Sequence, residues 1–192
     1  PVGYSDTTYF YDNNIDGADV VGDTDNFYFW AIRAVDHNGN ISGFTYRVGE
    51  IDYHLIDGWN AFGFPYYVDG INQAADLAAI IPDVTDLSYY IGGTGWNQWT
   101  SALPGFNNFY IYPGYAIWAY IPPPPIPYDY VLTLAGRLPD MEDITYGLHN
   151  GATPWNDIMI PLHRTDLTSA SGLHTDIPNA TSIAKWVTDG SY

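Results

Sequence analysis

An internal repeat constrains the fold of this chain more than any other feature of its sequence. Residues 59–96 align without a gap with residues 155–192, at an offset of 96 positions. Eight of the 38 aligned positions are identical, among them Trp59 with Trp155 and Pro82 with Pro178. Apolar character is kept at positions where identity is lost, such as Leu87, which aligns with Ile183. We therefore infer that the chain contains a duplicated structural unit.

Each repeat predicts a strand followed by a short helix. The strands are expected at residues 61–66 and 157–162, and the helices at 71–81 and 167–177. Apolar residues recur in both helices at spacings of three and four: Ala74, Leu77 and Ile81, and Ala170, Leu173 and Ile177. Thr168 or Ser169 is expected to cap the second helix, and a proline follows each helix. Further strands are expected at 96–100, 108–112 and 115–121.

Polar–apolar alternation predicts a β-hairpin near the N-terminus. Residues 26–35 alternate with the period of a strand, so that Tyr28, Trp30 and Ile32 should share one face. Residues 36–40 read Asp-His-Asn-Gly-Asn, which is typical of a turn, and residues 42–48 read as the returning strand.

This hairpin resembles the last two strands of a fibronectin type III domain. The resemblance is carried by Tyr28, at the tyrosine-corner position, by the run Ala34-Val35-Asp36, and by the run from Gly39 to Ser42. It covers roughly residues 7–50, and implies the C-terminal half of a β-sandwich.

The first repeat in turn resembles a repeat of bacterial and archaeal surface proteins that occurs in pairs beside fibronectin type III domains. The resemblance covers residues 55–192 and is carried by the Gly-Trp-Asn run at 58–60, the turn Pro113-Gly114-Tyr115 and Trp118. The second repeat departs from the pattern, since Pro154 stands where glycine is expected. The resemblance implies a location at the cell surface and no particular activity.

Together these features predict a mostly β, sandwich-like fold with two short helices. We expect a partial fibronectin-like unit at 1–50, a first surface repeat at 51–122, a stiff proline-rich connector at 123–127 and a second surface repeat at 128–192. The aligned second repeat reaches Tyr192, the counterpart of Trp96. We expect it to be completed either by further residues of a longer polypeptide or by a strand from a neighbouring molecule.

The charge of the chain excludes several partners. Its net charge is −17, with 22 acidic residues and only five basic ones. The basic residues are Arg33, Arg47, Arg137, Arg164 and Lys185. Nucleic-acid binding needs clustered cations, and an anionic membrane surface would repel this chain, so neither is expected. The longest apolar runs are also too short for a transmembrane helix, and we expect no membrane insertion.

One acidic segment has the spacing of a calcium-binding loop. Asp12, Asn14 and Asp16 occupy positions one, three and five, glycine follows, and Asp23 occupies position twelve. Oxygens at these positions converge on a hard cation, so bound Ca²⁺ is one interpretation. The other is an acidic surface turn, because no helical pattern flanks the segment.

Two glycosylation acceptor sequences occur, at Asn40-Ile-Ser and Asn179-Ala-Thr. Covalent glycans at Asn40 and Asn179 would suit an exposed filament. The residues form no catalytic constellation: the five histidines lack metal-binding spacing, and no two acidic residues stand out as a catalytic pair. We expect no enzyme activity.

The favoured function is therefore structural: a subunit or segment of an extracellular, glycosylated fibre that contacts copies of itself. The alternative is an adhesin or carbohydrate-binding module of a large cell-surface protein, since aromatic residues make up 17% of the chain. We expect four tryptophans at repeat positions, however, to lie in the core rather than at a sugar site. These are Trp59, Trp118, Trp155 and Trp186.

Overall fold

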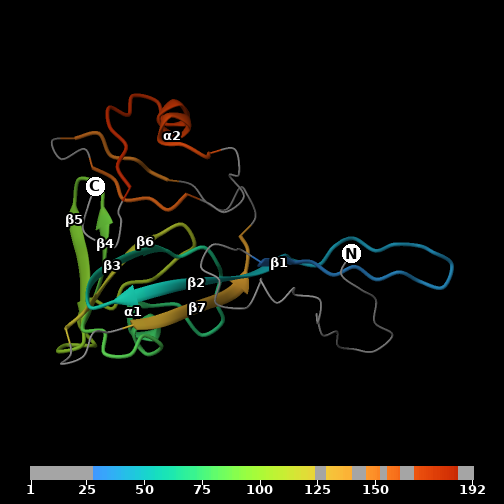
Figure 1. Ribbon diagram of the computed structural model, residues 1–192, viewed down its shortest axis with the longest axis horizontal. Coiled ribbons are helices and arrows are strands. Elements are labelled where there is room, and N and C mark those ends of the chain that lie inside the picture. The colour runs from blue at the N-terminus through green and yellow to red at the C-terminus, as the bar shows by residue number, and fades with distance from the viewer. Residues whose placement is uncertain (1–27, 124–128, 140–145, 152–154, 161–166, 186–192) are drawn as a thin grey trace.

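The computed structural model describes residues 28–123, 129–139, 146–151, 155–160 and 167–185. This part of the chain is mostly β, with two antiparallel sheets and two short helices, and it confirms the predicted fold class (Figure 1).

The first sheet has the strand order β1-β2-β7. Its strands are β1 (Tyr28–Trp30), β2 (Val48–Ile56) and β7 (Asp129–Arg137). β2 and β7 pair along nine residues, from Val48 opposite Arg137 to Ile56 opposite Asp129. β2 runs through the boundary that we placed between residues 50 and 51, and β7 comes from the segment that we assigned to the second repeat. The sheet therefore contains strands from three of the four segments into which we divided the sequence.

The second sheet has the strand order β3-β6-β4-β5. Its strands are β3 (Gly58–Gly63), β4 (Asp86–Ile91), β5 (Gly95–Thr100) and β6 (Ala116–Ile121). β5 and β6 lie within one residue of their predicted positions. The strand predicted at 61–66 begins and ends earlier. Backbone pairing continues to Phe64, whose N–H donates to the Tyr115 carbonyl oxygen at 2.8 Å, and then meets Pro65, which has no N–H to donate.

Both sheets and the first helix contribute to one hydrophobic core. Leu55 of β2, Leu132 of β7, Leu87 of β4 and Ile117 of β6 are at most 1% exposed. The Tyr53 ring packs on Phe62 across the sheets, with 5.1 Å between the ring centroids. Burying each large aliphatic side chain contributes about 1.5–3 kcal/mol, so this core is the main source of stability.

The two helices begin at equivalent positions of the repeat. α1 (Ala74–Ala78) follows Gln73, and α2 (Ala170–Asp176) follows Ser169, which is 96 positions further along. The Ser169 Oγ accepts a hydrogen bond from the Gly172 N–H at 3.1 Å, so of the two predicted caps, Thr168 and Ser169, Ser169 is the one that caps α2. Both helices are shorter than predicted. After Ala78 the backbone tightens to three-residue hydrogen bonds, such as that from Ile81 N–H to the Ala78 carbonyl oxygen.

A second local feature also recurs at the repeat spacing. Asp83 and Asn179, which follow the prolines behind the two helices, have positive φ angles of 59° and 65°. Asp and Asn tolerate this left-handed conformation better than most residues. The backbone thus repeats at the helix start and again at the turn behind the helix.

Burial does not repeat. Ala74, Leu77 and Ile81 of the first repeat are at most 2% exposed. Their counterpart Ala170 is exposed, and both Leu173 and Ile177 are only partly buried. Beyond Pro139, none of the residues that the structure describes is buried. The apolar face of α2 therefore lacks the cover that α1 receives.

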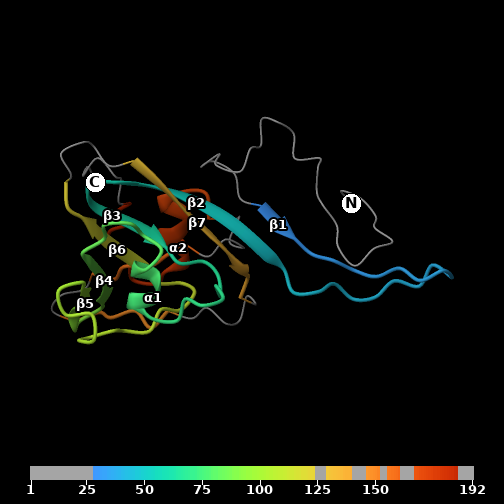
Figure 2. The same cartoon turned by 90° about the horizontal axis from the view of Figure 1, so that it is seen from below.

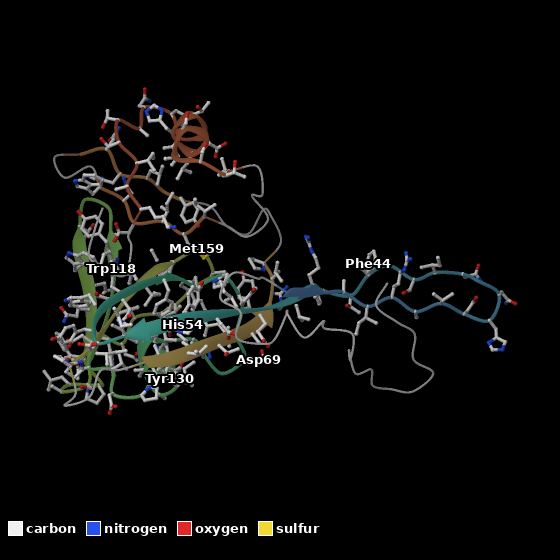
Figure 3. All side chains as sticks on the ribbon, viewed as in Figure 1. Phe44, His54, Asp69, Trp118, Tyr130 and Met159 are labelled. Carbon is white, nitrogen blue, oxygen red and sulfur yellow. The ribbon has the colours of Figure 1, made fainter. Side chains whose placement is uncertain are left out.

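Residues 155–160 of the second repeat lie against the first repeat and form no strand of their own. The Trp118 Nε1–H donates to the Asp157 carboxylate at 2.9 Å, and the Met159 N–H lies 3.4 Å from the Gly114 carbonyl oxygen (Figure 3). The Met159 side chain fills the space where a Cβ on Gly63 would stand, because that Cβ would be 2.1 Å from the Met159 Cγ. The strand predicted at 157–162 is thus wrong over 157–160, and its last two residues lie outside the described residues.

The prediction of core tryptophans is wrong for Trp59 and Trp155. Trp59 is 43% exposed and Trp155 is 59% exposed, while Trp118 is partly buried and Trp186 lies outside the described residues. Side chains alternate along β3, and Asn60 and Phe62 take the inward positions, so Trp59 faces out. There it packs on Tyr120 of β6, directly opposite, with 5.1 Å between ring centroids.

Candidate functional site: an exposed arm and an aromatic groove

Residues 31–48 form a hairpin that extends away from the rest of the molecule, and we call it the arm (Figures 1 and 2). Every residue from 31 to 48 is exposed. Ile32, Phe44 and Tyr46 are each about two-thirds exposed, at 68%, 66% and 68%. Soluble proteins rarely leave so many large apolar side chains together in water, so the arm is a candidate contact surface.

The arm is the predicted hairpin, with side-chain hydroxyls replacing part of the backbone ladder. The Thr45 N–H donates to the Ile32 carbonyl oxygen at 2.7 Å, and the Thr45 Oγ1 accepts from the Ile32 N–H at 3.1 Å. Ser42 makes the same pair of bonds to Ala34, at 2.9 and 2.8 Å. Thr45 and Ser42 therefore hold the two sides together without a regular strand pairing.

The predicted turn at the tip is fixed by Asp36. Its Oδ1 accepts from the N–H groups of Asn38 and Asn40, both at 2.8 Å, and its Oδ2 accepts from the Asn40 Nδ2 at 2.7 Å. These hydrogen bonds hold the pKa of the Asp36 carboxyl below its usual value, and the bond from the Asn40 side chain has the largest effect. Gly39 supplies the positive φ of 82° that the turn requires.

Charge distinguishes the arm from the rest of the chain. It carries Arg33, Arg47 and one acid, Asp36, whereas the whole chain has a net charge of −17. The Arg33 guanidinium lies 5.2 Å from the centre of the Phe44 ring. At the base of the arm, Arg137 of β7 lies over Tyr46 at 4.9 Å and over Tyr67 at 4.7 Å, which connects the arm to the body.

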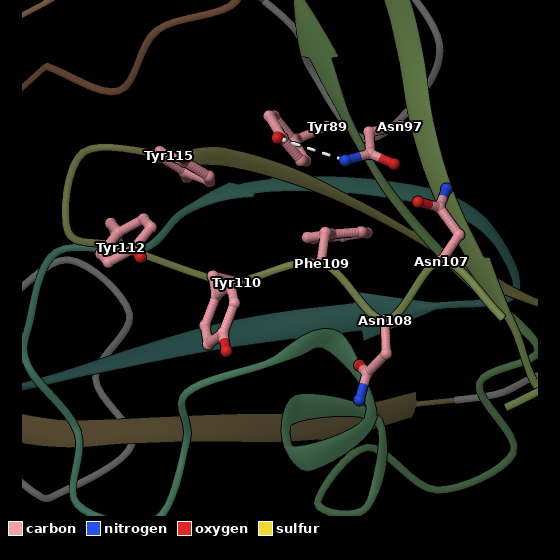
Figure 4. A pocket seen from close by; sticks show the side chains of 8 residues that line it. All are labelled: Tyr89, Asn97, Asn107, Asn108, Phe109, Tyr110, Tyr112 and Tyr115. Carbon is pink, nitrogen blue, oxygen red and sulfur yellow. Dashed lines mark hydrogen bonds between the residues drawn. The ribbon is translucent and has the colours of Figure 1, made fainter. Parts of the chain in front are cut away.

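A second candidate surface is an open groove of about 360 Å³ beside β4 and β5, which we call the aromatic groove (Figure 4). One side chain comes from β4, one from β5 and the rest from the loop before β6. The lining residues are Tyr89, Asn97, Asn107, Asn108, Phe109, Tyr110, Tyr112 and Tyr115. All are rings or amides, and none carries a charge at neutral pH.

The rings of the groove form a continuous cluster. Tyr89 lies 4.8 Å from both Phe109 and Tyr115, and Tyr115 lies 5.7 Å from Tyr112. Tyr112 stacks with Tyr110 at 6.3 Å. Tyr110 and Tyr112 are 58% and 51% exposed, while Phe109 is buried, so the cluster runs from the core out to solvent.

Sequence reasoning identified the alternation of Tyr110 and Tyr112 but not the groove. The segment 108–112 does alternate, with Phe109 and Ile111 buried, but it makes a single bridge, Gln73 to Tyr110, rather than a strand. Asn108 fixes the segment to α1, since its Oδ1 accepts from the Ala75 N–H at 2.8 Å and its Nδ2 donates to Gln73 at 2.9 Å.

The two predicted glycosylation sites differ in their surroundings. Asn40 is exposed at the tip of the arm, although its Nδ2 already donates to Asp36. Asn179 is exposed in the turn behind α2, with the positive φ noted above. Both positions are open to solvent, as a glycan requires, and their modification stays a prediction.

The predicted calcium loop cannot be compared with the structure, because Asp12, Asn14, Asp16 and Asp23 all lie outside the described residues. Within the described ranges, no group of three or more His, Asp or Glu side chains could hold a metal ion. Neither helix in the same ranges has the length and apolar character that crossing a bilayer requires.

No protein-family model, curated protein or solved structure matches the chain. The resemblances to fibronectin type III domains and to Gly-Trp-Asn surface repeats therefore stay predictions.

Proposed function

We propose that this chain is a structural subunit or segment of an extracellular, glycosylated protein fibre, in which the arm of one copy binds a neighbouring copy. The observation that supports this proposal most directly is the arm itself. Its 18 residues are all exposed, and they include large apolar side chains on both sides of the hairpin. A hairpin that is unpaired in water is marginally stable alone, and it gains from being covered by a partner.

The second repeat offers a surface of matching character. The face of α2 that carries Ala170, Leu173 and Ile177 is apolar by sequence and is not buried, although the equivalent face of α1 is. The partner also carries the acidic excess of the chain, which attracts Arg33 and Arg47 of an incoming arm. We therefore assign the second repeat of the next copy as the surface that the arm contacts.

Such a contact favours a fibre over a closed dimer. The arm and the second repeat are different surfaces of one molecule, so the contact is head-to-tail. A head-to-tail contact repeats from copy to copy and produces an open filament unless its rotation closes a ring. Asn40 lies at the tip of the arm and Asn179 in the turn behind α2, so glycans there require that both side chains stay in solvent at the edge of this contact.

Negative-stain electron microscopy and sedimentation of the native, full-length material test the proposal. We expect filaments, and mass spectrometry should find glycans on the same material. A monodisperse monomer at all concentrations would contradict the fibre.

A matched pair of variants tests the role of the arm. Ile32→Ser removes a large apolar side chain from the arm without adding charge, and Leu103→Ser removes one from a body loop of similar exposure, 61% against 68%. We expect Ile32→Ser to raise the concentration needed for assembly by about tenfold, since the contact loses one large apolar group. Leu103→Ser should assemble as the unmodified chain does. Equal effects of the two substitutions would exclude the arm as the contact.

The alternative function, an adhesin or carbohydrate-binding module of a cell-surface protein, is favoured by the aromatic groove. That groove lies outside both the arm and α2, so the two functions do not exclude one another.

A further inference from the structure

The aromatic groove presents two exposed rings next to fixed hydrogen-bond acceptors. Tyr110 and Tyr112 stand at its outer end with their planes 28° apart, and each ring is about half exposed. Asn97 and Asn107 stand at the other end (Figure 4). A ligand lying along the groove would therefore contact ring faces at one end and amides at the other.

The two amides are held so that their oxygens are available. The Asn97 Nδ2 donates to the Tyr89 hydroxyl at 3.3 Å, and the Asn107 Nδ2 donates to the Gln98 carbonyl oxygen at 2.7 Å. Asn107 also has a positive φ of 53°, which fixes its backbone in a turn. In the described part of the chain, no hydrogen bond occupies either Oδ1 atom or the hydroxyls of Tyr110 and Tyr112.

The charge of the surroundings disfavours an anionic ligand. The lining carries no charged side chain, and burial raises the pKa of Tyr115 to about 12, so its hydroxyl stays neutral. A phosphate or carboxylate would find no cation in the lining and would approach a chain of net charge −17. A wholly apolar ligand would leave the Asn97 and Asn107 oxygens unpaired, which costs free energy.

We propose that the aromatic groove binds a neutral carbohydrate, with a pyranose ring stacked on Tyr110 and Tyr112 and its hydroxyl groups donating to the Oδ1 atoms of Asn97 and Asn107. The face of an aromatic ring carries partial negative charge and attracts the C–H groups of a sugar face. Sugar hydroxyls supply the donors that the two amide oxygens lack. This site is separate from the fibre contact, and it goes beyond the structural function proposed above.

Isothermal titration calorimetry with the full chain tests the site. Neutral hexasaccharides of glucose, mannose and N-acetylglucosamine are the probes, and an oligogalacturonate is the anionic comparison. We expect at least one neutral probe to bind and the anionic one to bind more weakly. Binding of none of the neutral probes, or stronger binding of the anionic one, would overturn the proposal.

Three variants locate the binding. We expect Tyr110→Ala and Tyr112→Ala each to weaken binding about tenfold, because each removes one stacking face. Phe106→Ala is the matched control, since Phe106 is 71% exposed on the same loop but does not line the groove. Circular dichroism checks that each variant is folded. Unchanged affinity in both tyrosine variants would place the sugar elsewhere and overturn this assignment.

Two sources could supply the carbohydrate: a glycan on a neighbouring copy, or an external polysaccharide. Glycan-free recombinant chain and native glycosylated material distinguish them. Weaker binding of the soluble probe by native material indicates that a glycan of a neighbour already occupies the groove, whereas equal affinity indicates an external source. Either result supports the site, and the fibre assay above is independent of both.

Discussion

Two tyrosines of the core region, Tyr66 buried and Tyr53 partly buried, differ in whether their hydroxyl groups are paired. Tyr66 is fully buried, and within the described residues its hydroxyl has no hydrogen-bond partner. The Tyr53 hydroxyl donates to the Gly63 carbonyl oxygen at 2.7 Å. Burial raises the pKa of both groups, so both stay protonated at neutral pH. The difference in pairing should decide what each hydroxyl contributes to stability.

We predict that Tyr66→Phe raises the free energy of unfolding by about 1 kcal/mol, because it removes a buried, unpaired hydroxyl. Tyr53→Phe should lower it by about 1 kcal/mol, because the Gly63 carbonyl loses its donor. Urea denaturation measures both, provided that the dependence on denaturant is the same in all three proteins. Loss of stability in Tyr66→Phe would show that its hydroxyl has a partner, such as a bound water.

The burial of individual side chains was predicted correctly in the first helix and wrongly at Trp59. Ala74, Leu77 and Ile81 were predicted to lie on the inner face of a helix, and they are buried. Trp59 was expected in the core because it recurs at a repeat position, although the inward alternation of Phe62 and Phe64 along the same segment implies that Trp59 faces out. The alternation therefore predicted the orientation of Trp59 correctly, and its recurrence in the repeat did not.

At the scale of elements, the asparagine that follows Trp59 or Trp155 clamps the chain before it. The Asn60 Oδ1 accepts from the Ile56 N–H at 2.9 Å, and its Nδ2 donates to the Ile56 carbonyl oxygen at 2.8 Å. Asn156 makes the same two bonds to His149, at 2.8 and 2.9 Å. The first clamp spans four residues and the second spans seven.

One substitution between the repeats accounts for the different lengths of the two clamps. Gly58 lies inside the first clamp with a φ of +94°, and Pro154 stands at the equivalent position. A proline ring fixes φ near −65°, so a proline cannot adopt the positive φ that the tight turn of the first repeat requires. The departure from glycine that the sequence shows therefore has a structural consequence.

We predict that Asn60→Asp lowers the free energy of unfolding by about 3 kcal/mol. A carboxylate cannot donate to the carbonyl oxygens of Ile56 and Gly58, and the position is only 1% exposed, so a charge would be buried beside them. Asn156→Asp is the matched control. It should cost about 1 kcal/mol, since Asn156 is only partly buried. Equal losses in urea denaturation would contradict this account.

The elements of the candidate surfaces were only partly predictable. The arm followed from alternation and turn residues that are adjacent in sequence, so its hairpin could be predicted. The groove could not, because Tyr89 and Asn97 meet residues 107–115 through the pairing of β4 with both β5 and β6. No local pattern encodes that strand order.

At the scale of the whole molecule, the two segments that align in sequence differ in structure. β7 lies in the segment that we assigned to the second repeat, yet it pairs with β2 along nine residues and supplies Leu132 and Leu134 to the core. The helix of the second repeat is left without an equivalent sheet in the described part of the chain. The apolar side chains of this helix are those that we assign to the fibre contact. The missing cover over α2 therefore accounts both for the difference between the repeats and for the proposed assembly.

The hydrogen bond between Trp118 and Asp157 connects the two repeats and should make their packing depend on pH. Desolvation raises the pKa of the Asp157 carboxyl, and the Trp118 Nε1–H opposes this only in part. A carboxyl whose pKa is raised by folding binds its proton more tightly in the folded state. Its contribution to stability is therefore greatest below the unfolded pKa of about 3.9, and it falls as the pH rises through the folded pKa.

We predict that Asp157→Asn removes this dependence while keeping an oxygen to accept from Trp118. The stability of the variant relative to the unmodified chain should rise from pH 4 to pH 7, by less than about 1 kcal/mol because solvent screens a half-buried carboxylate. Urea denaturation across that range measures the difference, and NMR titration of the Asp157 carboxyl measures its pKa directly. A relative stability that falls with rising pH, or an Asp157 pKa below its usual value, would mean that the Trp118 bond outweighs desolvation. The contact between the repeats would then be an electrostatic attachment that strengthens with ionisation, rather than a packing contact that ionisation weakens.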